Sequence, residues 1–250
     1  MEYLLSRAGR KILMRLAGRR TLCAFDFDGT LSPIVARPDR AGMRARTSML
    51  LGSLARIYPC VIVSGRARAD LLGKLGGVPV ARVIGNHGAE TEIVAHSSRR
   101  VVQRWKPALE RELGSVPGVW VEDKGLSLAV HYRQSPQKAE ARRRILAASH
   151  LLKHVRVFGG KQVVNLVIDR APDKGVAVAA ERDRLACEWV LYVGDDDTDE
   201  DAFALEGDIV PVRIGRKQTS RARYFLRAQA EIDQLLTLLL RLRKFATPGP

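Results

Sequence analysis

The chain has 250 residues, of which 46% are apolar, so it can bury the core of one large domain or two small ones. Its formal net charge of +15 suggests an anionic partner, but only 6% of the residues are aromatic and the basic residues are scattered. Charge alone therefore does not separate nucleic acid from small anions, whereas the lack of any run of about 18 apolar residues excludes a membrane span.

The first twenty residues are basic, and their apolar positions predict a short amphipathic helix that packs against the domain, with no signal-peptide pattern. The three cysteines, Cys23, Cys60 and Cys187, all lie in or beside apolar runs. An odd number of cysteines in such positions predicts reduced thiols and a cytoplasmic location.

Five short runs rich in Val, Ile and Leu each end in a small or polar residue, which predicts parallel strands that are buried on both faces. Ligands of such sheets gather outside the carboxyl ends of the strands, so the polar residues there imply one site. The predicted strands are 21–25, 60–63, 80–84, 189–193 and 208–214, and the predicted helices are 43–57, 66–75, 174–183, 199–205 and a C-terminal helix from about 232.

The segment 91–169 has a different pattern, with two long helices and paired short strands that are joined by glycine turns. It predicts an α+β insert with an antiparallel sheet. The fold class is therefore α/β: a Rossmann-like core of residues 1–90 and 170–250 with a parallel sheet, and an inserted cap domain of residues 91–169. The predicted cap elements are helices 100–113 and 137–151 and strands 119–122, 126–132, 155–158 and 162–168.

Two aspartates, Asp26 and Asp28, follow the first predicted strand and precede Gly29 and Thr30. Side chains at i and i+2 of an extended chain point the same way, so these carboxylates would face one another across one site. Two like charges at such a short distance repel one another unless a cation lies between them, and Mg²⁺ prefers hard oxygen ligands. The pattern favours a magnesium site over a solvated acidic turn.

Four elements together favour phosphoryl transfer. Asp26 can attack phosphorus, because a carboxylate needs no base, and Asp28 can serve as general acid and base. Ser64 can hydrogen-bond a phosphoryl oxygen, and Lys174 can neutralise Asp26 and the transferring group. The acidic run 194–201 suits a metal site or open solvent. Taken alone, Ser64 would be a turn residue and Lys174 a solvated helix start, so the ordered set carries the prediction.

This set resembles the signature of haloacid-dehalogenase (HAD) phosphatases, and within that superfamily the chain is similar to the trehalose-6-phosphate phosphatase family. The superfamily signature is matched by 26–30, Ser64, Lys174 and 194–196. The match covers about 21–214. The narrower family is suggested by 30–34, 63–66, 85–90, 122–125, 131–133 and 194–203.

The resemblance implies a HAD core with a C2-type cap and an aspartyl-phosphate mechanism, in which Asp26 attacks and Asp28 is acid and base. It implies Mg²⁺ held by Asp26, the Asp28 carbonyl and Asp195, with Asp199 or Asp196 in support.

The same resemblance implies that the cap and the facing turn of the core bind the sugar phosphate. His87 fits a role in stabilising its glycine-rich turn equally well. Asn165 stands where the family has a glutamate, so the identity of the sugar is not determined. An amide can still donate and accept hydrogen bonds. The expected binding residues are Arg66, Asn86, His87, Gly88, Glu122, Lys124, Arg133 and Asn165.

The expected function is hydrolysis of trehalose 6-phosphate to trehalose and phosphate, in trehalose biosynthesis and carbohydrate metabolism. One alternative is a HAD phosphatase for another sugar or glycosyl phosphate. Another is a basic anion- or nucleic-acid-binding module with an inactive site, against which the intact set Asp26, Asp28, Lys174 and Asp195 weighs. We therefore expect a small-molecule partner and no nucleic acid; the oligomeric state is not readable from the chain.

Overall fold

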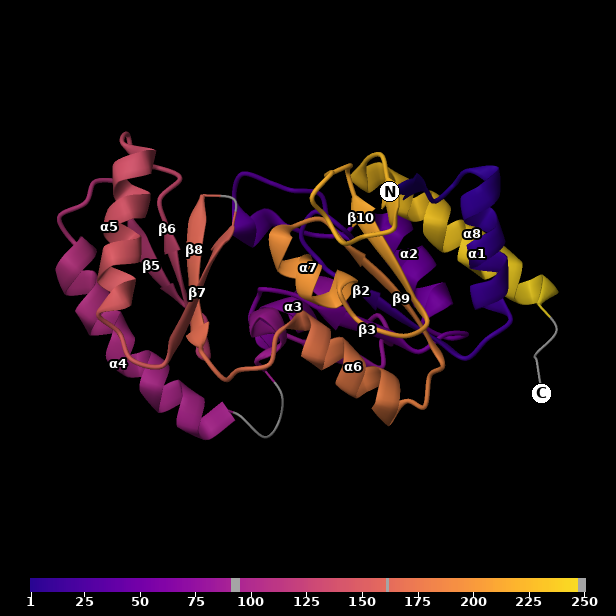
Figure 1. The fold of residues 1–250 in the computed structure, drawn as a ribbon, viewed down its shortest axis with the longest axis horizontal. Helices are drawn as coiled ribbons and strands as arrows, with labels where there is room; N and C mark the ends of the chain where they lie inside the picture. The colour runs from indigo at the N-terminus through magenta and orange to yellow at the C-terminus, as the bar shows by residue number, and fades with distance from the viewer. Residues whose placement is uncertain (91–94, 161, 247–250) are drawn as a thin grey trace.

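Two β-sheets, one parallel and one antiparallel, organise the part of the chain that the structure describes (Figure 1). The computed structural model describes residues 1–90, 95–160 and 162–246. The parallel sheet has the order β1-β11-β10-β9-β2-β3-β4. Its strands are β1 (Glu2–Tyr3), β2 (Thr21–Phe25), β3 (Cys60–Val63), β4 (Arg82–Ile84), β9 (Trp189–Gly194), β10 (Ile209–Ile214) and β11 (Tyr224–Leu226).

Helices cover both faces of the parallel sheet, because side chains along each strand alternate between two apolar clusters. Cys23 and Phe25 of β2 face one cluster, which α1 (Arg7–Ala17), α2 (Ala45–Leu54), α3 (Arg68–Leu75) and α8 (Ile232–Phe245) complete. Leu22 and Ala24 face the other cluster, with α6 (Lys174–Arg184) and α7 (Glu200–Phe203). Burial on both faces explains why these strands read as continuous apolar runs.

The antiparallel sheet has the order β5-β6-β8-β7 and lies beside the parallel sheet (Figure 1). Its strands are β5 (Trp120–Asp123), β6 (Ser127–His131), β7 (Val155–Gly160) and β8 (Val163–Ile168). Helices α4 (Ala95–Leu113) and α5 (Lys138–His150) pack on one face, over an apolar cluster that includes Trp105, Leu128 and Leu166. We call this unit the cap.

The other face of the cap sheet carries polar side chains. The strand register places Glu122 opposite Ala129, Ala129 opposite Asn165, and Asn165 opposite Phe158. Directly opposed residues point to the same side of a sheet. These four side chains therefore share the face that α4 and α5 leave uncovered.

The predicted fold class is confirmed: an α/β chain with a parallel sheet and a separate antiparallel sheet. The N-terminal helix is present as α1, and the cysteines are free and buried. In the part of the chain that the structure describes, no helix combines the length and apolarity needed to cross a bilayer. The division into 1–90, 91–169 and 170–250 stays a prediction.

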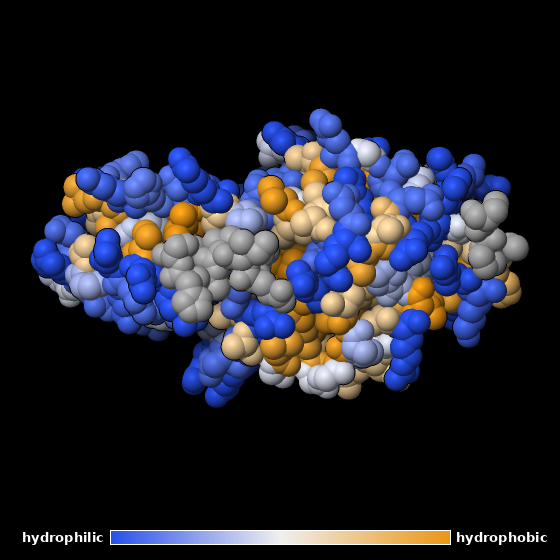
Figure 2. Space-filling view, turned by 90° about the horizontal axis from the view of Figure 1, so that it is seen from below, coloured by the Kyte–Doolittle hydropathy of each residue, from blue (hydrophilic) through white to orange (hydrophobic). Residues whose placement is uncertain are grey.

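Several short elements have no counterpart in the predicted pattern. Strand β1 has only two residues and pairs in parallel with β11, itself a three-residue strand. The described residues also form four short 3₁₀ turns: η1 (Pro38–Arg40), η2 (Asn86–Gly88), η3 (Asp197–Asp199) and η4 (Gln229–Glu231). Seen from below, polar side chains cover much of the surface and apolar ones gather in patches (Figure 2).

The start of α1 gives a test of how closely the N-terminal segment packs. A Cβ atom added to Gly9 would lie 2.2 Å from the backbone oxygen of Leu4, a buried residue. We expect Gly9→Ala to lower the free energy of unfolding by about 1–3 kcal/mol, the usual cost of overpacking. Gly18→Ala is the matched control, because the nearest atom to its Cβ would be 3.7 Å away. Equal urea midpoints for the two variants would contradict this packing.

Candidate active site

The carboxyl ends of four neighbouring strands bring the predicted site residues to one edge of the parallel sheet. Asp26 follows β2, Ser64 follows β3, and Asp195 follows β9. Asn86 stands two residues after β4 and is buried. Because β9, β2, β3 and β4 are adjacent and parallel, these residues lie along one line, where a ligand of such a sheet binds.

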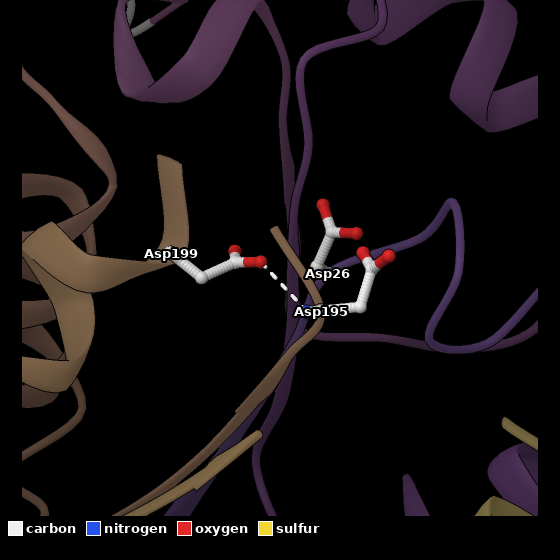
Figure 3. A group of neighbouring side chains, drawn as sticks. All are labelled: Asp26, Asp195 and Asp199. Carbon is white, nitrogen blue, oxygen red and sulfur yellow. Dashed lines mark hydrogen bonds between the residues drawn. The ribbon is translucent and has the colours of Figure 1, made fainter. Parts of the chain in front are cut away.

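Three carboxylates converge at this edge: Asp26, Asp195 and Asp199 (Figure 3). Each offers an oxygen within 4.8 Å of the others, and Asp26 and Asp199 are buried. The ammonium of Lys174 donates to Asp26 Oδ1 at 2.8 Å and to Asp199 Oδ1 at 2.7 Å. One ammonium cannot balance three carboxylates, and a set of hard oxygens with surplus negative charge fits Mg²⁺.

The buried groups perturb one another's protonation. Burial raises the pKa of Asp26 well above its usual value; the charge of Lys174 opposes this shift, while Asp199 and Asp195 add to it. Burial alone would lower the pKa of Lys174, but the charges of Asp199 and Asp26 outweigh it and raise that pKa. Lys174 is therefore a permanent cation in this site.

Asp199 holds the loop that follows β9. Its Oδ1 also accepts a hydrogen bond from the Tyr192 hydroxyl at 2.7 Å, and its Oδ2 accepts from the backbone N–H of Asp195 and Asp196 at 2.8 and 2.9 Å. The side chain of Asp196 instead caps η3, accepting from the N–H of Asp197 at 2.8 Å. Of the two predicted supporting residues, Asp199 is the one that joins the acidic cluster.

Asp28 pairs with Arg66 instead of joining that cluster. Arg66 donates to both carboxylate oxygens of Asp28, from Nε at 2.6 Å and from Nη2 at 2.8 Å, and also to Asp70 at 2.7 Å. A two-point contact of this kind fixes the orientation of the carboxylate. Gly29, directly after Asp28, lies against the Asp195 side chain: a Cβ added there would be 2.2 Å from Asp195 Oδ2, and its φ of +84° also favours glycine.

The cap meets the core beside Ser64, which is buried. Lys124 of the cap donates from Nζ to the Gly65 carbonyl at 3.1 Å. The Asn86 amide donates to Glu90 at 2.9 Å, and its oxygen accepts from Ser127 of the cap at 2.5 Å. Asn86 therefore links cap and core in this structure.

His87 packs tightly in the same turn. A Cβ on Gly65 would lie 2.3 Å from His87 Cε1, and the His87 ring meets Phe158 of the cap edge-on, with centroids 4.8 Å apart. Burial, together with the charges of Lys174 and Lys124, lowers the pKa of His87 well below its usual value. The ring is therefore neutral. Gly88, the next residue of the turn, lies against the start of α6, since a Cβ added there would be 2.3 Å from the Asp173 carbonyl oxygen.

The remaining predicted binding residues lie on the cap. Glu122 accepts a hydrogen bond from His131 Nε2 at 2.8 Å and lies 3.9 Å from Lys124 Nζ. Burial would raise the pKa of Glu122, but the His131 hydrogen bond and the Lys124 charge outweigh it and lower that pKa. Asn165 is buried in the middle of the uncovered face, and Arg133 reaches the carbonyl of Ala36 in the core at 3.4 Å.

The structure also brings to the site residues that the sequence did not single out. Tyr192 lies within an apolar strand, and Ser127 opens another, so neither has a motif around it. Phe158 and Arg156 lie on β7, whose pattern indicates only a strand. The place of each of these residues in the site becomes clear only from its contacts with segments that are distant in the sequence.

A family model described as trehalose-phosphatase matches residues 24–226. The chain belongs to this family. A trehalose-phosphate phosphatase of Mycobacterium avium is 37% identical over 206 residues, which cover 75% of this chain and 52% of the relative. One of Mycobacterium tuberculosis is 35% identical over 210 residues, which cover 77% of this chain and 53% of the relative. The chain thus spans about half the length of these curated relatives from the trehalose-phosphatase family.

Solved structures agree with this family in fold. The C-terminal domain of Candida albicans trehalose-6-phosphate phosphatase superimposes with a TM-score of 0.79 at 22% identity, covering 93% of this chain and 96% of that chain. Aspergillus fumigatus trehalose-6-phosphate phosphatase gives 0.65 at 25% identity, covering 96% and 99%.

Removing the buried cation tests the electrostatics of the cluster. Lys174→Met leaves three carboxylates without their ammonium, and we expect a loss of about 3–5 kcal/mol in the free energy of unfolding near neutral pH. The charge of Lys174 opposes the raised pKa of Asp26, so its loss raises that pKa further. Below the wild-type folded pKa, Asp26 is protonated in both proteins; the deficit therefore grows as pH rises above that value. Urea unfolding without Mg²⁺ should therefore show a smaller deficit at about pH 5 than at about pH 8.

Lys106→Met is the matched control. The Lys106 side chain is 38% exposed, and its ammonium makes only a long contact of 4.0 Å with Asp123. It should change stability little at either pH. A deficit in Lys174→Met that does not depend on pH would contradict the electrostatic explanation.

Proposed function

We propose that this chain hydrolyses trehalose 6-phosphate to trehalose and phosphate, with Mg²⁺, through an aspartyl-phosphate on Asp26. The observation that carries the proposal is the contact of Lys174 with Asp26 inside the cluster with Asp195 and Asp199. A buried carboxylate beside a fixed ammonium is suited to attack on a dianion, and the trehalose-phosphatase family supplies the substrate class.

The first step transfers the phosphoryl group to the protein. A carboxylate oxygen of Asp26 attacks phosphorus, and the bond from phosphorus to the sugar oxygen breaks. Asp28, as the carboxylic acid, gives its proton to the departing oxygen. Lys174 balances the charge on the phosphoryl group, and the Ser64 hydroxyl donates to one of its oxygens.

The second step returns the enzyme to its starting state. Asp28, now ionised, removes a proton from a water molecule that attacks phosphorus. Inorganic phosphate leaves, and the Asp26 carboxylate is regenerated. Arg66 donates to both oxygens of Asp28, a contact that favours the ionised form and orients it as the base of this second step.

We propose Asp26, Asp195 and the Asp28 carbonyl as ligands of the Mg²⁺ ion, with Asp199 in support. When bound, this ion supplies the positive charge that lets a phosphate dianion approach the acidic cluster. Asp199 fixes the Asp195 backbone through its hydrogen bond.

We propose that the sugar lies against the cap, near Glu122, Lys124, Arg133 and Asn165, with Arg66 and the Asn86-His87-Gly88 turn on the core side. A second candidate, hydrolysis of another sugar or glycosyl phosphate, is favoured by one observation: Asn165, an amide, occupies the centre of the uncovered cap face. The free cysteines support a reducing compartment, so we place the enzyme in the cytoplasm.

Replacing the nucleophile tests the mechanism. We expect Asp26→Asn to abolish phosphate release from trehalose 6-phosphate, because the amide cannot attack, while the fold survives. Loss of one like charge from the cluster should leave the melting temperature equal or higher. A malachite-green assay and a thermal melt measure the two effects. Substantial activity in the purified variant would exclude a covalent intermediate on Asp26.

Chelation tests the metal. Without the cation, the surplus negative charge of Asp26, Asp195 and Asp199 repels a phosphate dianion, so EDTA should stop turnover and added Mg²⁺ should restore it. The test uses the wild-type chain with trehalose 6-phosphate, glucose 6-phosphate and an aryl phosphate. Full activity in excess chelator would show that the acidic cluster works without a metal.

A further inference from the structure

The acidic run 194–201 holds more carboxylates than the cluster around Asp26 uses. Asp197 and Glu200 belong to this run but lie outside that cluster, and each is ion-paired with a basic side chain. Their shared partner is Arg213 of β10. The acidic run therefore has a second side, which faces β10 and not the predicted metal site.

Arg213 contacts the residues on both sides of η3. Its side chain is 8% exposed, and the residue lies on β10 in register with Gly194, the last residue of β9. Its Nη1 donates to the backbone carbonyl of Asp196 at 2.9 Å and to Glu200 Oε1 at 2.9 Å, and its Nη2 is 3.5 Å from Asp197 Oδ1. One guanidinium group thus spans the whole turn.

The segment between β10 and β11 supports the same turn. Glu200 Oε2 accepts from the backbone N–H of Arg221 at 2.7 Å, so both oxygens of Glu200 are engaged. Lys217 also contacts Asp197, but both side chains are largely exposed, and such pairs stabilise little. Arg213 is the buried member of this group of cations.

The backbone of Asp196 is held from two directions. Its N–H donates to Asp199 Oδ2, which faces the acidic cluster, and its carbonyl accepts from Arg213 on the other side. Stability of the sheet does not call for a charge at this position, because residues 209–212 of β10 are buried and apolar. Buried ion pairs are often no more stabilising than apolar side chains of similar size. Their geometry is what an apolar side chain cannot supply.

We propose that Arg213 is a positioning residue for the Mg²⁺ site. Through the Asp196 carbonyl and Glu200, it holds the loop after β9 in the conformation in which Asp195 and Asp199 converge on Asp26 (Figure 3). Groups that orient metal ligands change metal affinity by about 10–100-fold when they are removed. This inference rests on the proposed function, since it takes the acidic cluster as an Mg²⁺ site.

The test measures Mg²⁺ binding separately from turnover. Arg213→Met keeps a long side chain and removes the donors. We expect the dissociation constant of Mg²⁺, measured by calorimetry without substrate, to rise about tenfold. The Mg²⁺ concentration for half-maximal phosphate release from trehalose 6-phosphate should rise by a similar factor, while kcat at saturating Mg²⁺ stays within about threefold of the wild type. A merely structural role would lower the melting temperature and leave both Mg²⁺ values unchanged.

Arg82→Met is the matched control. Arg82 is the first residue of β4 in the same sheet, at the edge opposite the site, and it pairs with the buried carboxylate of Glu181 at 3.0 Å. Its loss should destabilise the protein without changing Mg²⁺ affinity. Arg213→Lys guards against a folding defect, because it keeps the charge and loses the forked geometry. Its dissociation constant should rise by about threefold, and it decides if Arg213→Met does not fold.

Three results would overturn this role of Arg213: wild-type Mg²⁺ affinity in the folded Arg213 variants, an equal loss of affinity in Arg82→Met, or a loss of kcat with unchanged affinity. A wild type that binds no Mg²⁺ refutes the metal of the proposed function and this inference together. A wild type that binds Mg²⁺ but does not hydrolyse trehalose 6-phosphate refutes the substrate alone, and calorimetry then decides the role of Arg213.

Discussion

The ion pair of Lys174 with Asp26 and Asp199 is the interaction on which the rest of this site depends. It joins residues 148 and 25 positions apart in the sequence, and all three side chains are almost completely buried. Buried charges persist only when they are paired and hydrogen-bonded. Lys174 is the first residue of α6, and the Asp173 side chain caps that helix by accepting from the N–H of Val176. The cap therefore fixes the backbone from which the Lys174 side chain extends.

Asp199 extends this network into the loop after β9. It binds Lys174 and Tyr192 through one oxygen and two backbone N–H groups through the other. One side chain therefore sets the position of the lysine and the position of Asp195 together. Gly194 makes this approach feasible, since a Cβ there would lie 2.2 Å from Asp199 Cγ.

If the cap binds the sugar as proposed, the contacts between cap and core would connect sugar recognition with the chemistry. Lys124 reaches the carbonyl of Gly65, next to Ser64, while Ser127 binds Asn86 in the turn after β4. In the proposed function, a sugar held on the face of the cap that α4 and α5 leave uncovered would strengthen these contacts beside the proposed phosphoryl site. Binding energy from a remote part of the substrate can thereby contribute to catalysis.

Much of the core could be predicted from the sequence because its strands are buried on both faces. Strands β2 and β3 have the predicted bounds, whereas β1 and β11 are too short to show any periodicity. Asp26 and Lys174 were predicted because each belongs to a local pattern at a strand end or helix start. Tyr192 and Phe158 were missed because their roles arise from packing between distant segments, and the Asp28–Arg66 pair was missed for the same reason.

The most direct measurement is to stop the wild-type enzyme with acid during turnover of trehalose 6-phosphate with Mg²⁺, and to weigh its peptides by mass spectrometry. An acyl phosphate survives such a quench long enough to be detected. The proposed mechanism predicts one added phosphoryl group on the peptide that contains Asp26, and none in a sample without substrate. Rapid phosphate release with that peptide unmodified, or a phosphoryl group on another residue, would contradict the role of Asp26.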